Sequence, residues 1–134
     1  MNGEEAKPAE AKKAKTSTGL EENVAGLLCY LAGFITGIIF LIIEKESSFV
    51  RFHAMQSTIT FLSLAILNWI IGAITWLMIF TPYTWGLVAI LGVISILITI
   101  VAIIFWILGM YMAYRGQRYK FPIFGNLAES FLKQ

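Results

Sequence analysis

The stretch Leu87-Val-Ala-Ile-Leu-Gly-Val-Ile-Ser-Ile-Leu-Ile-Thr-Ile-Val-Ala-Ile-Ile-Phe-Trp-Ile-Leu-Gly-Met-Tyr-Met112 contains 26 residues and no formal charge. An α-helix rises about 1.5 Å per residue and the hydrocarbon core of a bilayer is about 30 Å thick, so this stretch can cross a membrane as a helix. Two further uncharged runs, 57–80 and 24–43, contain 24 and 20 residues. The sequence therefore predicts an integral membrane protein with three spans.

The three runs indicate helices rather than strands. Only helices and closed barrels satisfy all their backbone groups in lipid, and these runs are continuously apolar rather than alternating. Hydrophobic residues make up 58% of the 134 residues, which leaves little chain for a separate soluble domain. We predict an all-α transmembrane helical bundle, with a disordered tail at 1–17 and a single membrane domain at 18–134. Within that domain, residues 116–134 should form an interfacial C-terminal segment.

The charged residues are separated from the apolar runs. All eight acidic residues and all ten Lys and Arg lie outside them. With three spans, the connection 44–56 and the C-terminal tail share one side, which carries six Lys and Arg, mostly near span ends. The opposite side carries four, all in the N-terminal tail. Because basic residues beside spans favour the cytoplasm, we expect a multi-pass protein of the cell membrane with a cytoplasmic C-terminus. Lipid phosphates account for these cations, so we expect no nucleic-acid partner.

Small and weakly polar residues mark the expected helix contacts. In lipid, small residues let helix backbones approach closely, and amide or hydroxyl groups bond to neighbouring helices. Gly33 and Gly37 form a GxxxG motif in the first run, which favours packing within the chain, with homodimerisation as the alternative. The expected packing residues are Gly33, Gly37, Asn68, Gly92, Ser95, Thr99 and Gly109.

The polar residues at and within the second run fall mostly on one broad side when residues are placed 100° apart. His53, Gln56 and Thr60 lie on that side near the start of the helix. They predict a polar vestibule that would bind a small ligand or relay protons.

Several charged residues flank the predicted spans. Arg51 lies where the second helix would meet the membrane surface, so its guanidinium is expected to reach a lipid headgroup phosphate. The alternative is a structural clasp in which Arg51, Arg115 or Arg118 pairs with Glu44 on the same side.

The residue types that catalysis requires are sparse. His53 is the only histidine, Cys29 is the only cysteine, and there is no aspartate. No serine lies in a nucleophile motif, and no glycine-rich phosphate loop is present. We therefore expect no catalytic residues, no metal site, no cofactor and no enzymatic activity.

Three separated motifs carry a family resemblance. They are Thr18-Gly-Leu-Glu-Glu-Asn-Val-Ala-Gly-Leu-Leu-Cys-Tyr-Leu-Ala-Gly-Phe-Ile-Thr-Gly-Ile, Phe49-Val-Arg-Phe-His-Ala-Met-Gln-Ser and Gly109-Met-Tyr-Met-Ala-Tyr-Arg-Gly-Gln-Arg-Tyr-Lys-Phe-Pro-Ile-Phe-Gly. The chain after residue 17 resembles an uncharacterised family of small archaeal and bacterial membrane proteins. That family is distantly grouped with the chloroplast import component Tic-twenty. The resemblance implies a membrane location and a helical fold.

Two classes of function agree with these features. The first is a structural, accessory or interaction protein, which the packing-rich, uncharged spans favour. The second is an oligomeric channel or a translocase component resembling the Tic-twenty-like proteins, which the polar side of the second helix favours. The expected partners are the lipid bilayer and either further copies of the chain or other membrane proteins.

Overall fold

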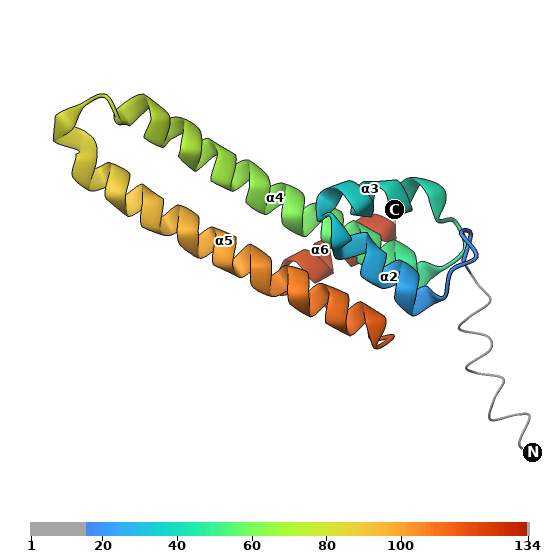
Figure 1. Cartoon of the computed structure of the whole chain (residues 1–134). Coiled ribbons are helices and arrows are strands. Elements are labelled where there is room, and N and C mark those ends of the chain that lie inside the picture. The colour runs from blue at the N-terminus through green and yellow to red at the C-terminus, as the bar shows by residue number, and fades with distance from the viewer. Residues whose placement is uncertain (1–15, 134) are drawn as a thin grey trace, which may run out of the picture.

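A computed structural model describes residues 16–133, and in this range the chain is helical with no strands (Figure 1). The elements are α2 (Glu22–Leu31), α3 (Phe34–Ile43), α4 (Ser48–Met78), the 3₁₀ turn η1 (Pro82–Thr84), α5 (Trp85–Tyr114) and α6 (Phe124–Leu132). The all-α prediction is thereby confirmed for the described chain. The tail predicted at 1–17 lies, apart from Thr16 and Ser17, outside the described residues.

Helices α4 and α5 form a long antiparallel hairpin. With 31 and 30 residues they extend about 46 and 45 Å, more than the hydrocarbon core requires. Among the described residues, two helical stretches are long and apolar enough to span a membrane: α4, and α5 with the preceding turn η1. Their outer surface is apolar, and the Trp69 and Trp76 side chains are 73% and 65% exposed. The predicted span at 87–112 therefore lies within α5, and the predicted span at 57–80 lies in α4 except for its last two residues.

The predicted span at 24–43 is wrong, because the chain reverses in its middle. It forms α2 and α3, each of ten residues and so about 15 Å long, which is half the thickness of the core. Gly33 lies between them with φ 62° and ψ −131°, a conformation that glycine adopts far more readily than other residues. The two short helices lie side by side at one end of the long hairpin, with α3 against α4 and α2 against both α4 and α5 (Figure 1).

The reversal places non-helical backbone beside apolar helices, where unpaired polar groups would be costly. Nearby hydroxyls satisfy these groups. Thr36 Oγ1 accepts from the Ala32 N–H (3.1 Å) and donates to the Cys29 carbonyl (3.1 Å). Ser57 Oγ donates to the Gly33 carbonyl over 2.9 Å. The reversal is thus hydrogen-bonded within the chain. Both ends of α2–α3 lie at the same end of the bundle, where the Ser17 N–H meets the Glu44 carboxylate, so we call this pair the re-entrant hairpin.

The C-terminal segment returns along the bundle. Gly116 has φ +75° and ends α5 in a Schellman motif, in which Gly116 N–H bonds Ala113 O (3.0 Å) and Gln117 N–H bonds Met112 O (2.9 Å). Residues 117–121 then lead to α6, which packs on α4. α6 buries Gly125 and Ala128 and exposes apolar side chains on its other side, as an interfacial helix does.

The re-entrant hairpin brings all the charged segments that the structure describes to one end. The Ser17 N–H bonds the Glu44 carboxylate, and the Arg118 guanidinium bonds the Ser48 carbonyl. The turn at the opposite end, residues 79–86, contains no charged residue. The six Lys and Arg predicted to share the C-terminal side therefore lie at one end, and the four predicted on the opposite side lie outside the described residues.

Candidate functional site

A polar clasp lies in the core of the charged end, made of the Tyr30, His53 and Gln56 side chains and the backbone of residues 117–121. Tyr30 comes from α2, and His53 and Gln56 lie nearly one turn apart on α4. The Tyr30 hydroxyl is 2.8 Å from His53 Nδ1 and 2.8 Å from Gln56 Nε2. His53 Nε2 is 3.0 Å from the Gln117 carbonyl. These bonds join the re-entrant hairpin, helix α4 and the C-terminal segment.

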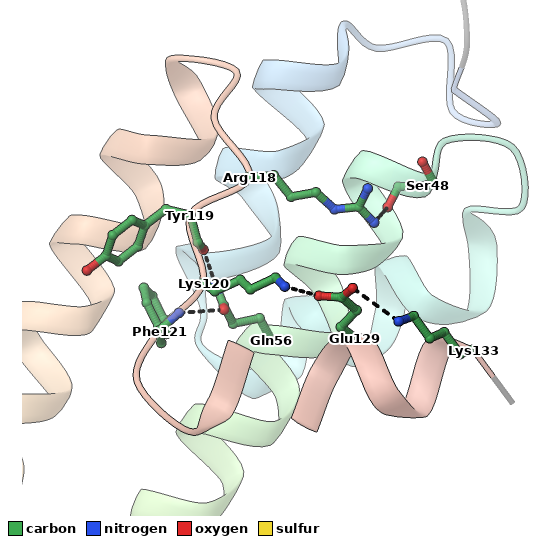
Figure 2. Close-up of polar contacts among 8 residues, drawn as sticks. All are labelled: Ser48, Gln56, Arg118, Tyr119, Lys120, Phe121, Glu129 and Lys133. Carbon is green, nitrogen blue, oxygen red and sulfur yellow. Dashed lines mark hydrogen bonds and ion pairs between the residues drawn. The ribbon is translucent and has the colours of Figure 1, made fainter. Parts of the chain in front are cut away.

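Gln56 fixes the C-terminal segment at two further points. Its Nε2 donates to the Tyr119 carbonyl over 3.0 Å, and its Oε1 accepts from the Phe121 N–H over 2.9 Å (Figure 2). The amide thus uses both its donor and acceptor functions on groups of this chain.

The bonds in the clasp define a single proton arrangement. A carbonyl only accepts, so His53 Nε2 must carry the proton that reaches Gln117. The Gln56 amide donates to the Tyr30 oxygen, and the Tyr30 hydroxyl then donates to unprotonated His53 Nδ1. The clasp therefore holds a neutral imidazole. A second proton on His53 would leave the Tyr30 hydroxyl facing another donor.

The predicted polar vestibule is not an open feature. His53, Gln56 and Thr60 each have 0% of their surface exposed. The Thr60 hydroxyl has no hydrogen-bond partner in the described residues, whereas the other two side chains are bonded within the clasp. The side of α4 that carries these three residues faces protein.

The predicted ion pairs to Glu44 are also replaced by other contacts. The Glu44 carboxylate is buried and accepts from the backbone N–H groups of Ser17, Glu46 and Ser47 at 2.9–3.1 Å. Arg51 Nη1 donates to the Glu44 carbonyl over 2.8 Å, so it caps the C-terminus of α3. Glu44 and Arg51 are joined through the backbone.

The two C-terminal arginines differ in their contacts. Arg115 is exposed and lies over the Tyr111 ring, 5.6 Å from its centroid. Arg118 lies 4.9 Å from the Phe52 ring centroid and donates to the Ser48 carbonyl over 3.3 Å (Figure 2). Arg118 therefore ties the C-terminal segment to the start of α4. Its partner is the Ser48 carbonyl, whereas the predicted partner was Glu44.

The predicted packing residues divide into two groups. Added Cβ atoms at Gly37 and Gly109 would lie 2.6 Å from Thr58 Oγ1 and from the Tyr30 ring, respectively. Asn68 bonds Ser95 (2.5 Å) and Thr99 (3.0 Å) across α4 and α5, as expected of a polar contact between spans. Gly33 serves the chain reversal, with Phe61 in ordinary contact, and a Cβ at Gly92 would meet nothing within 4 Å. Both glycines of the GxxxG motif therefore contact residues of this chain.

A basic cleft of about 640 Å³ lies beside the clasp at the charged end. Residues from the α3–α4 connection, the start of α4, the segment after α5, and α6 line it. They are Lys45, Glu46, Ser48, Arg51, Arg118, Lys120, Glu129, Leu132 and Lys133. Sequence reasoning missed most of this set because its members are separated by up to 88 positions and share no periodic pattern.

Glu44 gives the charged end a dependence on pH. Burial opposes its ionisation, but the N–H donors of Ser47, Ser17 and Glu46 outweigh burial and hold the pKa of Glu44 below its ordinary value of 4.5. The unfolded chain therefore binds the proton first, so this stabilisation is present above about pH 4.5 and is lost as pH falls through the lowered pKa.

We expect the thermal midpoint to fall as the pH drops below about 4.5, and Glu44→Gln to flatten part of that fall. Lys120 and Lys133 also lower the pKa of Glu129, so this carboxylate contributes to the same fall in stability. Glu129→Gln is therefore measured as well, to separate its contribution from that of Glu44. An unchanged pH profile in Glu44→Gln would contradict the assigned hydrogen bonds.

Within residues 16–133, no group of three or more His, Cys, Asp or Glu side chains is placed to hold a metal ion. The buried polar side chains other than Thr60 bond within the chain, and the described charges gather at one end. A two-helix apolar hairpin, a re-entrant hairpin and a charged end together define a small helical membrane protein.

More specifically, the chain belongs to the magnetosome magnetite crystal formation protein family, whose family model matches residues 14–128. A UPF0132 membrane protein of Methanocaldococcus jannaschii is 48% identical, with 87% of this chain and 94% of the relative covered. A UPF0132 membrane protein of Archaeoglobus fulgidus is 45% identical, with 82% and 94% covered. No solved structure matches the chain. These matches confirm a family of small membrane proteins, and none of them concerns Tic-twenty.

Proposed function

We propose that this protein is a structural or interaction protein of the cell membrane. Its long hairpin anchors it in lipid, and its charged end forms a fixed platform at the membrane surface. The carrying observation is the polar clasp, in which Tyr30, His53 and Gln56 bond only to groups of this chain. Such a network stabilises one arrangement of the helices and the C-terminal segment.

The distribution of charge supports an orientation. The described cations gather at one end, and the turn at 79–86 has none. Because basic residues close to spans favour the cytoplasmic side, we place the charged end and the C-terminus in the cytoplasm.

The channel or translocase alternative depended on a wet side of α4. His53 and Gln56, which would have lined that pathway, are buried and bonded. The alternative thereby loses its main support. The description of the family concerns magnetite crystals, whereas the structural role rests on the polar clasp and the charged end.

Flux through liposomes that contain the purified protein tests this proposal. We expect release of ions and small solutes no faster than from protein-free liposomes. We also expect crosslinking in native membranes to recover discrete partner proteins or further copies of the chain. Flux that His53→Leu abolishes while the protein remains folded would overturn the structural role.

A further inference from the structure

The basic cleft carries an excess of positive charge that the fold does not neutralise. Five of its lining residues are basic and two are acidic, which leaves three net positive charges in about 640 Å³. A cleft of this size accommodates a small anionic group. Ser48, the first residue of the 31-residue helix α4, also lines it, so the positive end of that helix dipole borders the cleft.

The guanidinium groups of Arg51 and Arg118 are held in place by hydrogen bonds that use only some of their N–H groups. Arg51 uses Nη1 on the Leu41 and Glu44 carbonyls, and Arg118 uses Nη2 on the Ser48 carbonyl. Each guanidinium has five N–H donors in a planar fork, which matches the oxygens of a phosphate group. The fold thus orients both arginines and leaves other donors of each group for a ligand.

A carboxylate occupies part of the same cleft. Lys120 and Lys133 both approach Glu129, and Figure 2 shows the two ammonium groups converging on it from opposite sides. Glu129 therefore provides internally the negative charge that an external anion would supply. An anion that enters the cleft must compete with Glu129 for these lysines.

The location of the cleft agrees with an anion at the membrane surface. It lies between the start of a spanning helix and α6, whose Leu127 and Phe131 side chains are exposed apolar groups of an interfacial helix. Phosphate groups of lipids are found at this depth, and soluble phosphate compounds reach it from the water.

We propose that the basic cleft binds a phosphate group, carried either by a lipid headgroup or by a soluble phosphate compound. The bound phosphate contacts Arg51 and Arg118 and takes over the two lysines that pair with Glu129. This site is independent of the scaffold role, since binding and platform rigidity are measured separately.

The test uses the full chain in detergent with four probes: phosphatidylglycerol, phosphatidylcholine, inorganic phosphate and pyrophosphate. Native mass spectrometry and ligand-dependent thermal shifts give the apparent Kd for each. Lys45→Gln should weaken binding about threefold, and Arg118→Gln about tenfold, because each removes a cleft charge. Lys45 is informative because its ammonium makes no ion pair or hydrogen bond with residues 16–133, so its loss leaves the fold intact.

Two further variants sharpen the result. Arg115→Gln removes a cation at the same end that does not line the cleft, so affinity should stay unchanged. Glu129→Gln frees two lysines and should tighten binding about threefold. Selective retention of phosphatidylglycerol assigns the lipid source, and tighter binding of pyrophosphate assigns a soluble one. Equal losses in Lys45→Gln and Arg115→Gln, weaker binding in Glu129→Gln, or no binding of any probe would each overturn the site.

Discussion

Replacing Gln56 with leucine is expected to lower the free energy of unfolding by about 3 kcal/mol or more, because buried groups that lose a hydrogen-bond partner cost about 1–3 kcal/mol each. The substitution removes the partner of the Tyr119 carbonyl and of the Phe121 N–H, and it removes one donor to the Tyr30 hydroxyl. Denaturation by SDS of detergent-solubilised protein, followed by tryptophan fluorescence, measures the change.

Gln117→Leu is the matched control, since the Gln117 side chain is exposed and only its carbonyl contacts His53. It should change stability by less than about 0.5 kcal/mol. Limited proteolysis should also cut the segment 117–121 faster in Gln56→Leu than in the control. Equal stability of the two variants would contradict the clasp.

The second large effect is expected at Gly37, where α3 touches α4. An added Cβ would lie 2.6 Å from Thr58 Oγ1 and 2.9 Å from the Ala54 carbonyl. Because the Ala54 contact is backbone, the two helices must move apart, and Gly37→Ala should cost about 1–3 kcal/mol in the same unfolding measurement.

Gly92→Ala is the same substitution in open surroundings, and there we expect a gain in stability instead of a loss. A Cβ at Gly92 meets nothing within 4 Å, so only helix propensity remains, and stability should rise by about 0.5–1 kcal/mol. Equal losses of stability in Gly92→Ala and Gly37→Ala would contradict the close contact between α3 and α4 at Gly37.

Part of this fold follows from local physics. The length of the uncharged runs predicts the two long spans. Asn68, Ser95 and Thr99, expected at helix contacts, predict the contact between the spans. Each of these features depends on neighbouring residues or on one helix face, and sequence patterns report such features well.

The reversal at Gly33 could not be recognised in the same way. A run of 20 apolar residues has the composition of a span whether it is straight or folded back, and Gly33 with Gly37 also matches a packing motif. What decides the outcome is a set of distant partners, among them Ser57, which bonds the Gly33 carbonyl. The same is true of the clasp, whose acceptors are backbone carbonyls without a sequence signature.

The re-entrant hairpin is the feature on which the placement of the clasp, the charged end and the basic cleft depends. It requires residues before α2 and residues after α3 to lie on the same side of the membrane. The buried Cys29 is first replaced by alanine. A single cysteine is then introduced by Thr18→Cys, Lys45→Cys or Tyr83→Cys, and its labelling shows on which side of the membrane that position lies.

Labelling with a membrane-impermeant maleimide in right-side-out and inverted vesicles is the most direct test. The account predicts that the cysteines at positions 18 and 45 react from one and the same side, and that the cysteine at 83, where Tyr83 is 98% exposed, reacts from the other. Labelling of positions 18 and 45 from opposite sides would show that residues 24–43 cross the membrane, and would contradict the account.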